Sequence, residues 1–296
     1  MELSKLGVWA GMDAFTAPEA AAFAKRVEGW GYGALWFPEA MGRNSLVHAA
    51  WLLANTNTLV IATGIANIYA RDWVAASGAQ KALNEQSGGR FLLGLGVSHI
   101  PLVEGFRGQH YGKPVETMRA YLEGMKKAHY TAPPPPETPK TVIAALGPKM
   151  LSLAAEQADG AHPYNVTPEH TAQARKTLGL GKLLCPEQMI LAESDPAKAR
   201  AKARASLKIY LSLPNYFNNW KRLGFTDADF ADGGSDRLID AIVAWGDDEA
   251  IRRRLQAHWD AGADQVCIQA LGGLGTPIPK PDEELLKRFA PGASAS

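Results

Sequence analysis

The sequence is poor in cysteine and shows no metal-binding pattern. Cys185 and Cys267 are the only two cysteines among 296 residues, and both lie in apolar stretches. Such cysteines are typically buried small hydrophobic residues in a reducing compartment, an interpretation we favour over a disulfide or a redox pair. The seven histidines are scattered, without HxxxH spacing, and no CxxC pair occurs. No metal site is therefore expected.

Long hydrophobic runs and an excess of one charge are also missing. No apolar run approaches the roughly 18–20 residues that a membrane span needs, so no membrane segment is expected. The 31 basic and 30 acidic residues give a net charge of +1, which provides no reason to expect nucleic acid as a partner. The first residues, MELSKLGVWAG, lack the basic and long apolar parts of a secretion signal. We therefore expect a cytoplasmic globular protein.

Short apolar runs alternate with longer, helix-like segments along the whole chain. Near-continuous apolarity is typical of parallel strands that are covered on both faces. Eight such units in one chain of this length favour a single-domain α/β fold, a (β/α)8 TIM barrel, over an open doubly wound sheet. The predicted strands are Leu6–Ala10, Ala34–Phe37, Leu59–Ile65, Phe91–Gly96, Thr141–Ala145, Gly160–Tyr164, Met189–Ala192 and Gln265–Ala270.

Helix-start signals occupy the segments between these runs. Thr16 and Glu19 have the spacing of a capping box. Thr167 and Asp195 each stand directly before a proline, an arrangement that is typical of an N-cap followed by the first helical residue.

Three segments depart from the alternation. The four prolines at 133–136 predict a stiff, extended spacer before the fifth strand. Residues 210–235 are rich in aromatic residues, Asn, Asp and Gly, and predict an insertion before the last barrel helix. The insertion either covers the substrate pocket or is a plain surface elaboration. We assign residues 1–290 to one barrel domain and 291–296 to a disordered tail.

In a barrel of this type the functional residues lie just after the strands, so these loops are where we look for the site. Gly147, Pro148 and Lys149 begin a helix after the fifth strand, and its free N–H groups suit a phosphate. An ordinary strand-to-helix turn explains the same residues equally well. Gly94 and Gly96 lack the third glycine of a dinucleotide fingerprint, so we reject a Rossmann fold.

Two titratable residues near strand ends are candidates for catalysis. His99 follows the fourth strand in a polar turn, and an imidazole there suits proton transfer, although a lone histidine is more often structural. Glu39 follows the second strand, where burial would raise its pKa unless it pairs with a cation such as Arg43. We expect Arg71 and Asp72 to form a structural charge pair that caps the third helix.

Read together, the loops resemble the luciferase-like monooxygenase superfamily, in particular its actinobacterial branch that uses the deazaflavin coenzyme F420. The segments that carry the resemblance span nearly the whole chain. They are GYGALWFPEA, ATGIANIYARDW, GGRFLLGLGVSH, KPVETMRAYLEGM and ALGPKMLSLAAEQADGAHPYNVTPEHT.

This resemblance implies a bacterial luciferase-like barrel with the flavin or deazaflavin across the C-terminal strand ends. It places a non-prolyl cis peptide within Thr63-Gly64-Ile65, beside the ring. The resemblance assigns cofactor binding to a set of residues from four loops. They are Thr63, Gly64, Ile65, Asn67, Ser98, His99, Ala145, Leu146, Gly147, Lys149, Tyr164 and Asn165.

The sequence departs from the family pattern at two positions. Many relatives have an acidic residue followed by a histidine after the second strand, whereas here Ala40 follows Glu39. Some deazaflavin-dependent relatives have a glutamate at the end of the fourth strand, where this chain has His99. We therefore expect His99 to take over the proton transfer.

The leading hypothesis is an oxidoreductase that moves a hydride between coenzyme F420 and a small, partly apolar organic substrate. The first alternative is an FMN-dependent monooxygenase of the same fold, and the second is a non-catalytic flavin- or deazaflavin-binding protein. The resemblance also implies a homodimer, through the helices that follow the second and third strands. The residues expected to line the substrate pocket are Trp9, Trp36, Phe106, Tyr216 and Phe217.

Overall fold

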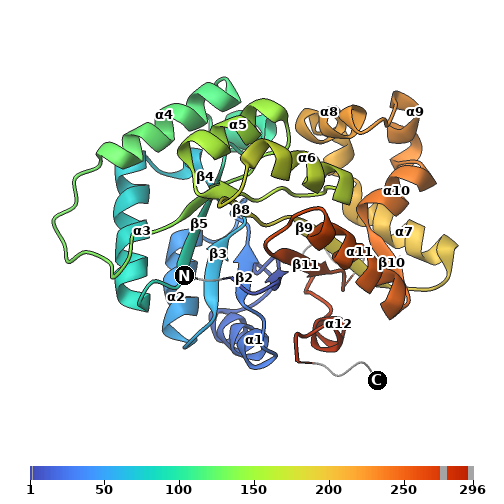
Figure 1. Cartoon of the computed structure of the whole chain (residues 1–296), viewed down its shortest axis with the longest axis horizontal. Helices are drawn as coiled ribbons and strands as arrows, with labels where there is room; N and C mark the ends of the chain where they lie inside the picture. The colour runs from blue at the N-terminus through green and yellow to red at the C-terminus, as the bar shows by residue number, and fades with distance from the viewer. Residues whose placement is uncertain (2, 274–278, 293–296) are drawn as a thin grey trace.

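The computed structural model describes residues 1, 3–273 and 279–292, and within them it shows one curled parallel sheet surrounded by helices (Figure 1). The sheet has eleven strands among the described residues, in the order β10-β9-β11-β1-β2-β3-β5-β6-β7-β8, with β4 paired to β5. The strands are β1 (Leu6–Trp9), β2 (Ala34–Phe37), β3 (Val60–Thr63), β4 (Ala66–Asn67), β5 (Phe91–Gly96), β6 (Thr141–Ile143), β7 (Gly160–Ala161), β8 (Leu183–Leu184), β9 (Glu187–Ala192), β10 (Ala244–Gly246) and β11 (Val266–Ala270).

The barrel closes at β8 and β9, which only Cys185 and Pro186 separate along the chain. The first of these strands pairs with β7 and the second with β11. The Cys185 N–H donates to the carbonyl oxygen of Ala161, which extends the pairing of β8 with β7. The Cys267 N–H donates to the carbonyl oxygen of Pro186, where β9 pairs with β11. The predicted (β/α)8 barrel is thereby confirmed, and each of the eight predicted runs overlaps a strand.

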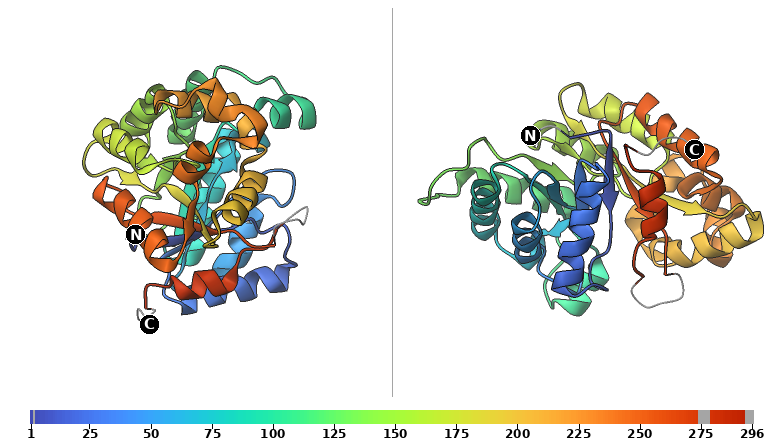
Figure 2. Two further views of the ribbon diagram at one scale, coloured as in Figure 1. Left: turned by 90° about the vertical axis from the view of Figure 1, so that its right-hand side faces the viewer. Right: turned by 90° about the horizontal axis from the view of Figure 1, so that it is seen from below.

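Twelve α-helices of the described chain cover this sheet, as two further views show (Figure 2). They are α1 (Ala17–Gly29), α2 (Ser45–Ala54), α3 (Trp73–Ser87), α4 (Pro114–Lys127), α5 (Pro148–Gln157), α6 (Pro168–Leu178), α7 (Pro196–Leu207), α8 (Pro214–Arg222), α9 (Asp227–Phe230), α10 (Asp236–Ile242), α11 (Asp248–Asp260) and α12 (Glu283–Arg288). None of the described helices is long and apolar enough to cross a membrane.

The helix starts follow the sequence signals. Thr16 and Glu19 form the predicted capping box at α1. Thr167 caps α6 through its hydroxyl, and Asp195 caps α7 by accepting two backbone N–H groups. The prolines at 133–136 lie in the extended loop between α4 and β6, which projects from the left side of the molecule in Figure 1.

The inside of the barrel is filled by side chains. Cys185 and Cys267 are free and fully buried there, as expected for small apolar residues. Trp36 is also fully buried in this interior and donates from Nε1 to Oε1 of Gln265 (2.8 Å). Trp36 therefore does not line an open pocket, which corrects the sequence expectation.

Residues 210–235 form short helices beside the barrel mouth rather than an irregular loop. They comprise η3 (Tyr210–Ser212), α8, α9 and η4 (Ala231–Gly233), which occupy the upper right of Figure 1 together with α10. Trp220 of α8 is fully buried and donates from Nε1 to the carbonyl oxygen of Asn165 (3.1 Å). The insertion therefore packs on the loop after β7. Of the expected tail, 293–296 lies outside the described residues.

Candidate active site at the C-terminal ends of the strands

The backbone between β3 and β4 contains the cis peptide that the family resemblance implied, between Gly64 and Ile65. The Gly64 carbonyl oxygen accepts a hydrogen bond from Nε1 of Trp9 (3.0 Å), and its N–H donates to the carbonyl oxygen of Phe37 (2.7 Å). A Cβ atom at position 64 would lie 2.8 Å from Nε2 of His162 and 2.8 Å from Nε1 of Trp9. Only glycine therefore fits between these two side chains.

The glycines of β5 give the β3–β4 segment the room it needs. A Cβ atom at Gly94 would lie 1.9 Å from the Thr63 carbonyl oxygen, and one at Gly96 would lie 2.4 Å from Cδ1 of Ile65. The Thr63 hydroxyl donates to the Gly94 carbonyl (2.7 Å) and accepts from the Gly94 N–H (2.8 Å). Of Thr63, only the backbone is therefore left to approach a cofactor.

Glu39 holds the loops after β2 and β3 together. Its Oε1 accepts from the Ser45 N–H (3.0 Å) and from the Arg71 guanidinium, and its Oε2 accepts from the Asn67 N–H (2.9 Å). Its own N–H donates to the carbonyl oxygen of Ile65 (3.0 Å). The carboxylate therefore joins the start of α2 to β4 and to Arg71 after it, while the Glu39 backbone holds Ile65.

The charge partners of Glu39 differ from the sequence expectation. Glu39 pairs with Arg71 in a buried contact, with 4% and 8% of the two side chains exposed, and not with Arg43. Burial acts to raise the pKa of Glu39, but the hydrogen bond and charge of Arg71 and the backbone N–H donors outweigh it and lower the pKa. Arg71 is therefore not the partner of Asp72, although Asp72 does cap α3.

His99 lies in the turn after β5, beside the insertion. Its ring centroid is 5.9 Å from that of Tyr216 on α8, and its side chain forms a hydrogen bond with Asn215. Burial lowers the pKa of His99, and the hydrogen bond with Asn215 acts in the opposite direction. The neighbouring Ser98 has a left-handed backbone (φ 58°), and its carbonyl oxygen accepts from the Tyr111 hydroxyl (3.3 Å).

The guanidinium of Arg222, at the end of α8, lies beside the N-terminus of α5, a neighbour that the sequence did not reveal. Gly147 is the N-cap, and a Cβ atom there would lie 3.1 Å from Nη2 of Arg222 at the end of α8. Within the described part of the chain Arg222 has no ion-pair or hydrogen-bond partner. The Met150 N–H donates to the Gly147 carbonyl (3.1 Å), and Pro148 has no N–H, so the Lys149 N–H is the free donor of this first turn. Together with the Arg222 guanidinium beside Gly147, this helix N-terminus suits a phosphate. Lys149 is exposed on the first turn of the same helix.

The loop after β7 holds several buried polar atoms without a partner in the described structure. Asn165 has a left-handed backbone (φ 56°), and both polar atoms of its amide are unpartnered. The Asn165 N–H donates to Oε2 of Glu187 on β9 (3.1 Å), while Oε1 of Glu187 has no partner. Burial raises the pKa of Glu187 to about 8, so this carboxyl group is protonated at neutral pH.

His162 is a further site residue that sequence reasoning missed, because it lies inside a predicted strand. Its ring stacks on Trp36 with centroids 4.4 Å apart, and its Nδ1 donates to the Cys185 carbonyl (2.7 Å). Burial lowers the pKa of His162 to about 4, so the ring is neutral and Nε2 is an acceptor. This unpartnered Nε2 lies next to Gly64, 2.8 Å from where a Cβ atom at that position would be.

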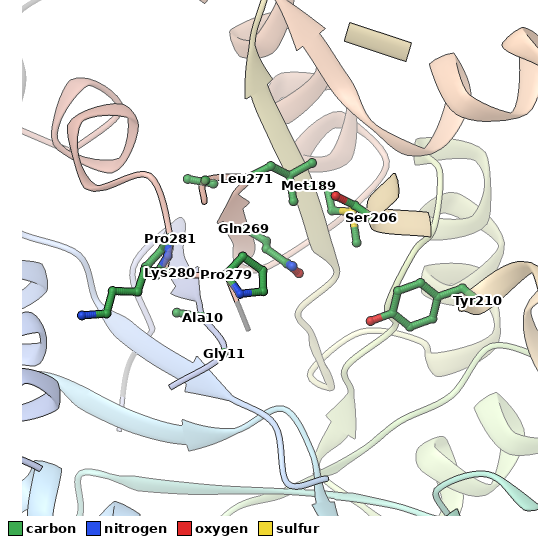
Figure 3. Close-up of a pocket in the computed structure, with 12 residues that line it drawn as sticks. Ala10, Gly11, Met189, Ser206, Tyr210, Gln269, Leu271, Pro279, Lys280 and Pro281 are labelled. Atoms are coloured by element: carbon green, nitrogen blue, oxygen red, sulfur yellow. The ribbon is translucent and has the colours of Figure 1, made fainter. Parts of the chain in front are cut away.

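A pocket opens beside the ends of β1, β9 and β11 (Figure 3). Tyr210 and Gln269 point into it, and both are hydrogen-bonded to Tyr164. Tyr164 also contacts Trp9, with ring centroids 5.0 Å apart. The expected pocket residue Phe106 is instead 59% exposed on the surface.

The structure thus brings Gly64, Ile65, Asn67, Ser98, His99, Gly147 and Asn165 to one end of the barrel, in the loops after β3, β5, β6 and β7. Ala145 and Leu146 lead into α5, and the Leu146 carbonyl accepts from Nε2 of His170 (2.8 Å). The side chains of Glu39, Thr63 and Asn67 are occupied by hydrogen bonds to neighbouring backbone groups.

Comparisons with known proteins identify the family of the chain. The family model for luciferase-like monooxygenases matches residues 3–265. A Mycobacterium tuberculosis protein named as a putative coenzyme F420-dependent oxidoreductase is 25% identical, over 90% of this chain and 94% of its own length.

Solved structures share the fold. The coenzyme F420-dependent tetrahydromethanopterin reductase of Methanopyrus kandleri superposes with a TM-score of 0.76 at 17% identity, covering 99% of both chains. The oxygenating constituent of 3,6-diketocamphane monooxygenase from Pseudomonas putida, in complex with FMN, gives a TM-score of 0.68 at 14% identity, covering 98% of both chains. Because the family model spans most of the sequence, the chain belongs to the luciferase-like monooxygenase family.

Proposed function

We propose that this protein is an oxidoreductase that binds the deazaflavin coenzyme F420 and exchanges a hydride with a small, partly apolar organic substrate. Relatives that match across nearly the whole chain are named as F420-dependent enzymes. Family membership makes flavin-type redox chemistry the expected activity, and the features of the site support a phosphate-bearing cofactor.

The observation that carries the proposal is the unpaired guanidinium of Arg222 beside Gly147. Arg222 is exposed, and a cation next to a helix N-terminus without a protein anion suits a phosphate. Gly147 keeps the approach open, because a side chain at this position would begin 3.1 Å from the guanidinium. Arg222, Gly147 and Lys149 are therefore the residues that would hold the cofactor phosphate.

The ring would lie against the β3–β4 backbone, where Gly64 and Ile65 present peptide groups and no polar side chain. The unpartnered amide of Asn165 supplies both a donor and an acceptor for the polar edge of a heterocycle. When bound, the deazaflavin supplies the hydride-accepting or hydride-donating centre. The protein positions it and keeps water from the reacting face.

His99 is the proposed acid–base residue. Oxidation of an alcohol to a carbonyl releases a proton along with the hydride, and a neutral imidazole can accept that proton. Burial lowers the pKa of His99, so the ring is predominantly neutral at pH 7.

Titration of the purified protein with coenzyme F420 and, separately, with FMN tests this proposal, with cofactor fluorescence as the signal. We expect saturable binding of the deazaflavin, weakened in Arg222→Met and unchanged in Lys221→Met, which removes the neighbouring cation. Binding of FMN without any binding of the deazaflavin would refute the F420 assignment and favour the monooxygenase alternative.

We also propose that the protein forms a homodimer through α2 and α3. Val47 and Trp51 on α2 are 71% and 43% exposed, and Trp73 and Val74 on α3 are 38% and 48% exposed. The two helices are neighbours, so these side chains supply an apolar surface that a second copy would bury. The opposite face of α2, with Ala49, Leu52 and Leu53, is buried in the protein's own core.

A further inference from the structure

The pocket at β1, β9 and β11 displays a fixed pattern of hydrogen-bonding groups. The Oε1 of Gln269 lies 2.9 Å from the Tyr164 hydroxyl, and since an amide oxygen has no hydrogen, the phenol must donate to it. The Tyr164 oxygen can then only accept at its 3.1 Å contact with the Tyr210 hydroxyl, so Tyr210 donates. The donor and the acceptor of both hydrogen bonds, from Tyr210 to Tyr164 and from Tyr164 to Gln269, are thereby determined.

Two unused groups remain, and both face the pocket. Because Oε1 of Gln269 is held by Tyr164, the amide Nε2 is directed away from it, and within the described residues it has no partner. The Tyr210 oxygen keeps lone pairs after donating its hydrogen to Tyr164. Figure 3 shows Gln269 and Tyr210 directed into the same space. These two side chains therefore offer the amide donors of Gln269 and an acceptor on Tyr210.

Apart from Lys280, the described pocket wall is uncharged, and its one further polar side chain, Ser206, donates to the Lys202 carbonyl (3.5 Å). Met189, Leu271, Pro279 and Pro281 are apolar, and Lys280 is the one charged side chain among the described lining residues. The amine of Lys280 points away from the cavity in Figure 3 and pairs with Glu19 at 3.2 Å. Burial raises the pKa of Tyr210 to about 12, so its phenol is neutral at physiological pH. A charged ligand would find no counter-ion here.

We propose that this pocket binds an uncharged organic molecule through a hydroxyl group, whose oxygen accepts from the Gln269 amide and whose hydrogen is donated to Tyr210. A hydroxyl is both a donor and an acceptor, so it satisfies both unused groups at once, whereas a carbonyl satisfies only Gln269. The assignment rests on the proposed function in one respect, because it takes the occupant to be the substrate that exchanges hydride with the deazaflavin.

Ligand-observed NMR titrations, which measure the binding of three matched probes to the full chain, test the pocket directly. The probes are cyclohexanol, cyclohexanone and cyclohexanecarboxylate, each titrated with and without coenzyme F420. We expect cyclohexanol to bind most tightly, cyclohexanone roughly three- to tenfold more weakly through the loss of one hydrogen bond, and the carboxylate not to bind. Tighter binding of the carboxylate than of the alcohol would overturn the proposal.

Two variants assign the contacts. Tyr210→Phe should weaken cyclohexanol roughly three- to tenfold and leave cyclohexanone unchanged, because only the alcohol donates to the phenol. Gln269→Met should weaken both. Tyr130→Phe and the exposed Gln173→Met serve as matched controls and should change neither, and thermal unfolding verifies that each variant is folded. Equal weakening of both probes by Tyr210→Phe would refute the assigned hydrogen-bond directions.

The assignment of the pocket and the proposed F420-dependent function can fail separately. If the protein binds cyclohexanol with this pattern but does not bind the deazaflavin, the pocket assignment stands and the proposed function falls. If it binds the deazaflavin and cyclohexanol binds neither the free nor the cofactor-loaded protein, the pocket assignment falls and the proposed function stands.

Discussion

Replacing Arg71 with methionine should strongly destabilise the protein, because it would leave the carboxylate of Glu39 buried without its charge partner. Both side chains of the pair are less than a tenth exposed. The two remaining donors to Glu39 are the backbone N–H groups of Ser45 and Asn67. They hold the oxygens in place but supply no full positive charge.

The expected loss follows from the burial of the pair. Removing one partner of a buried ion pair costs about 3–5 kcal/mol, far more than the loss of an exposed pair. With a urea m-value of roughly 3 kcal/mol/M, the unfolding midpoint should fall by about 1 M or more. The exposed pair of Arg253 with Glu249, 65% and 81% exposed, provides the matched control, and Arg253→Met should change stability by at most about 0.5 kcal/mol.

The pH dependence of the variant distinguishes this cause from a simple packing defect. In the wild-type protein the lowered pKa of Glu39 contributes stability above its unfolded pKa, which is lost as the pH falls. Without Arg71, burial dominates and raises the folded pKa, so acidification from pH 7 towards about 4.5 should recover part of the lost stability relative to the wild type.

Urea unfolding followed by circular dichroism at pH 7 and pH 5 measures these effects. Glu39→Gln combined with Arg71→Met should be more stable at pH 7 than Arg71→Met alone, because no charge is left buried. A loss below about 1 kcal/mol for Arg71→Met, or a difference from wild type that does not shrink on acidification, would refute the reasoning.

Four further predictions concern the site and the surface. Arg222→Met should weaken deazaflavin binding about tenfold or more, because a charge-assisted contact to phosphate is lost, whereas Lys221→Met should have little effect; equal losses would contradict the phosphate site. Because burial lowers the pKa of His99, activity should stay level through neutral pH and fall only on further acidification, as His99 protonates, and His99→Ala should abolish this acid limb. The raised pKa of Glu187 favours the folded state at low pH, and this contribution is lost as the pH rises to about 8. Glu187→Gln should therefore remove this fall in the free energy of unfolding between pH 5, 7 and 9, as measured by urea unfolding. Trp51→Glu should shift the protein from dimer to monomer in analytical ultracentrifugation, and a wild-type monomer would contradict the proposed interface.

Local signals in the sequence determined the architecture. The positions of buried strands and helix caps are signalled by residues that are close in sequence, so the apolar runs and the Thr16–Glu19 capping box predicted elements that the structure confirms. The strands β4, β8 and β10, each two or three residues long, were not predicted, although the equally short β6 and β7 were. The cis peptide was predicted from family resemblance, not from spacing.

The tertiary structure decided which groups face one another and what charge they carry. The partner of Glu39 is Arg71, 32 residues away, and the expected Arg43 instead donates to backbone carbonyls of the loop after β1. Arg222 reaches Gly147 from the insertion, and Glu187 is protonated because the closed barrel removes it from water. The charge state of a buried group depends on every element that packs around it, and the order of residues along the chain does not contain that information.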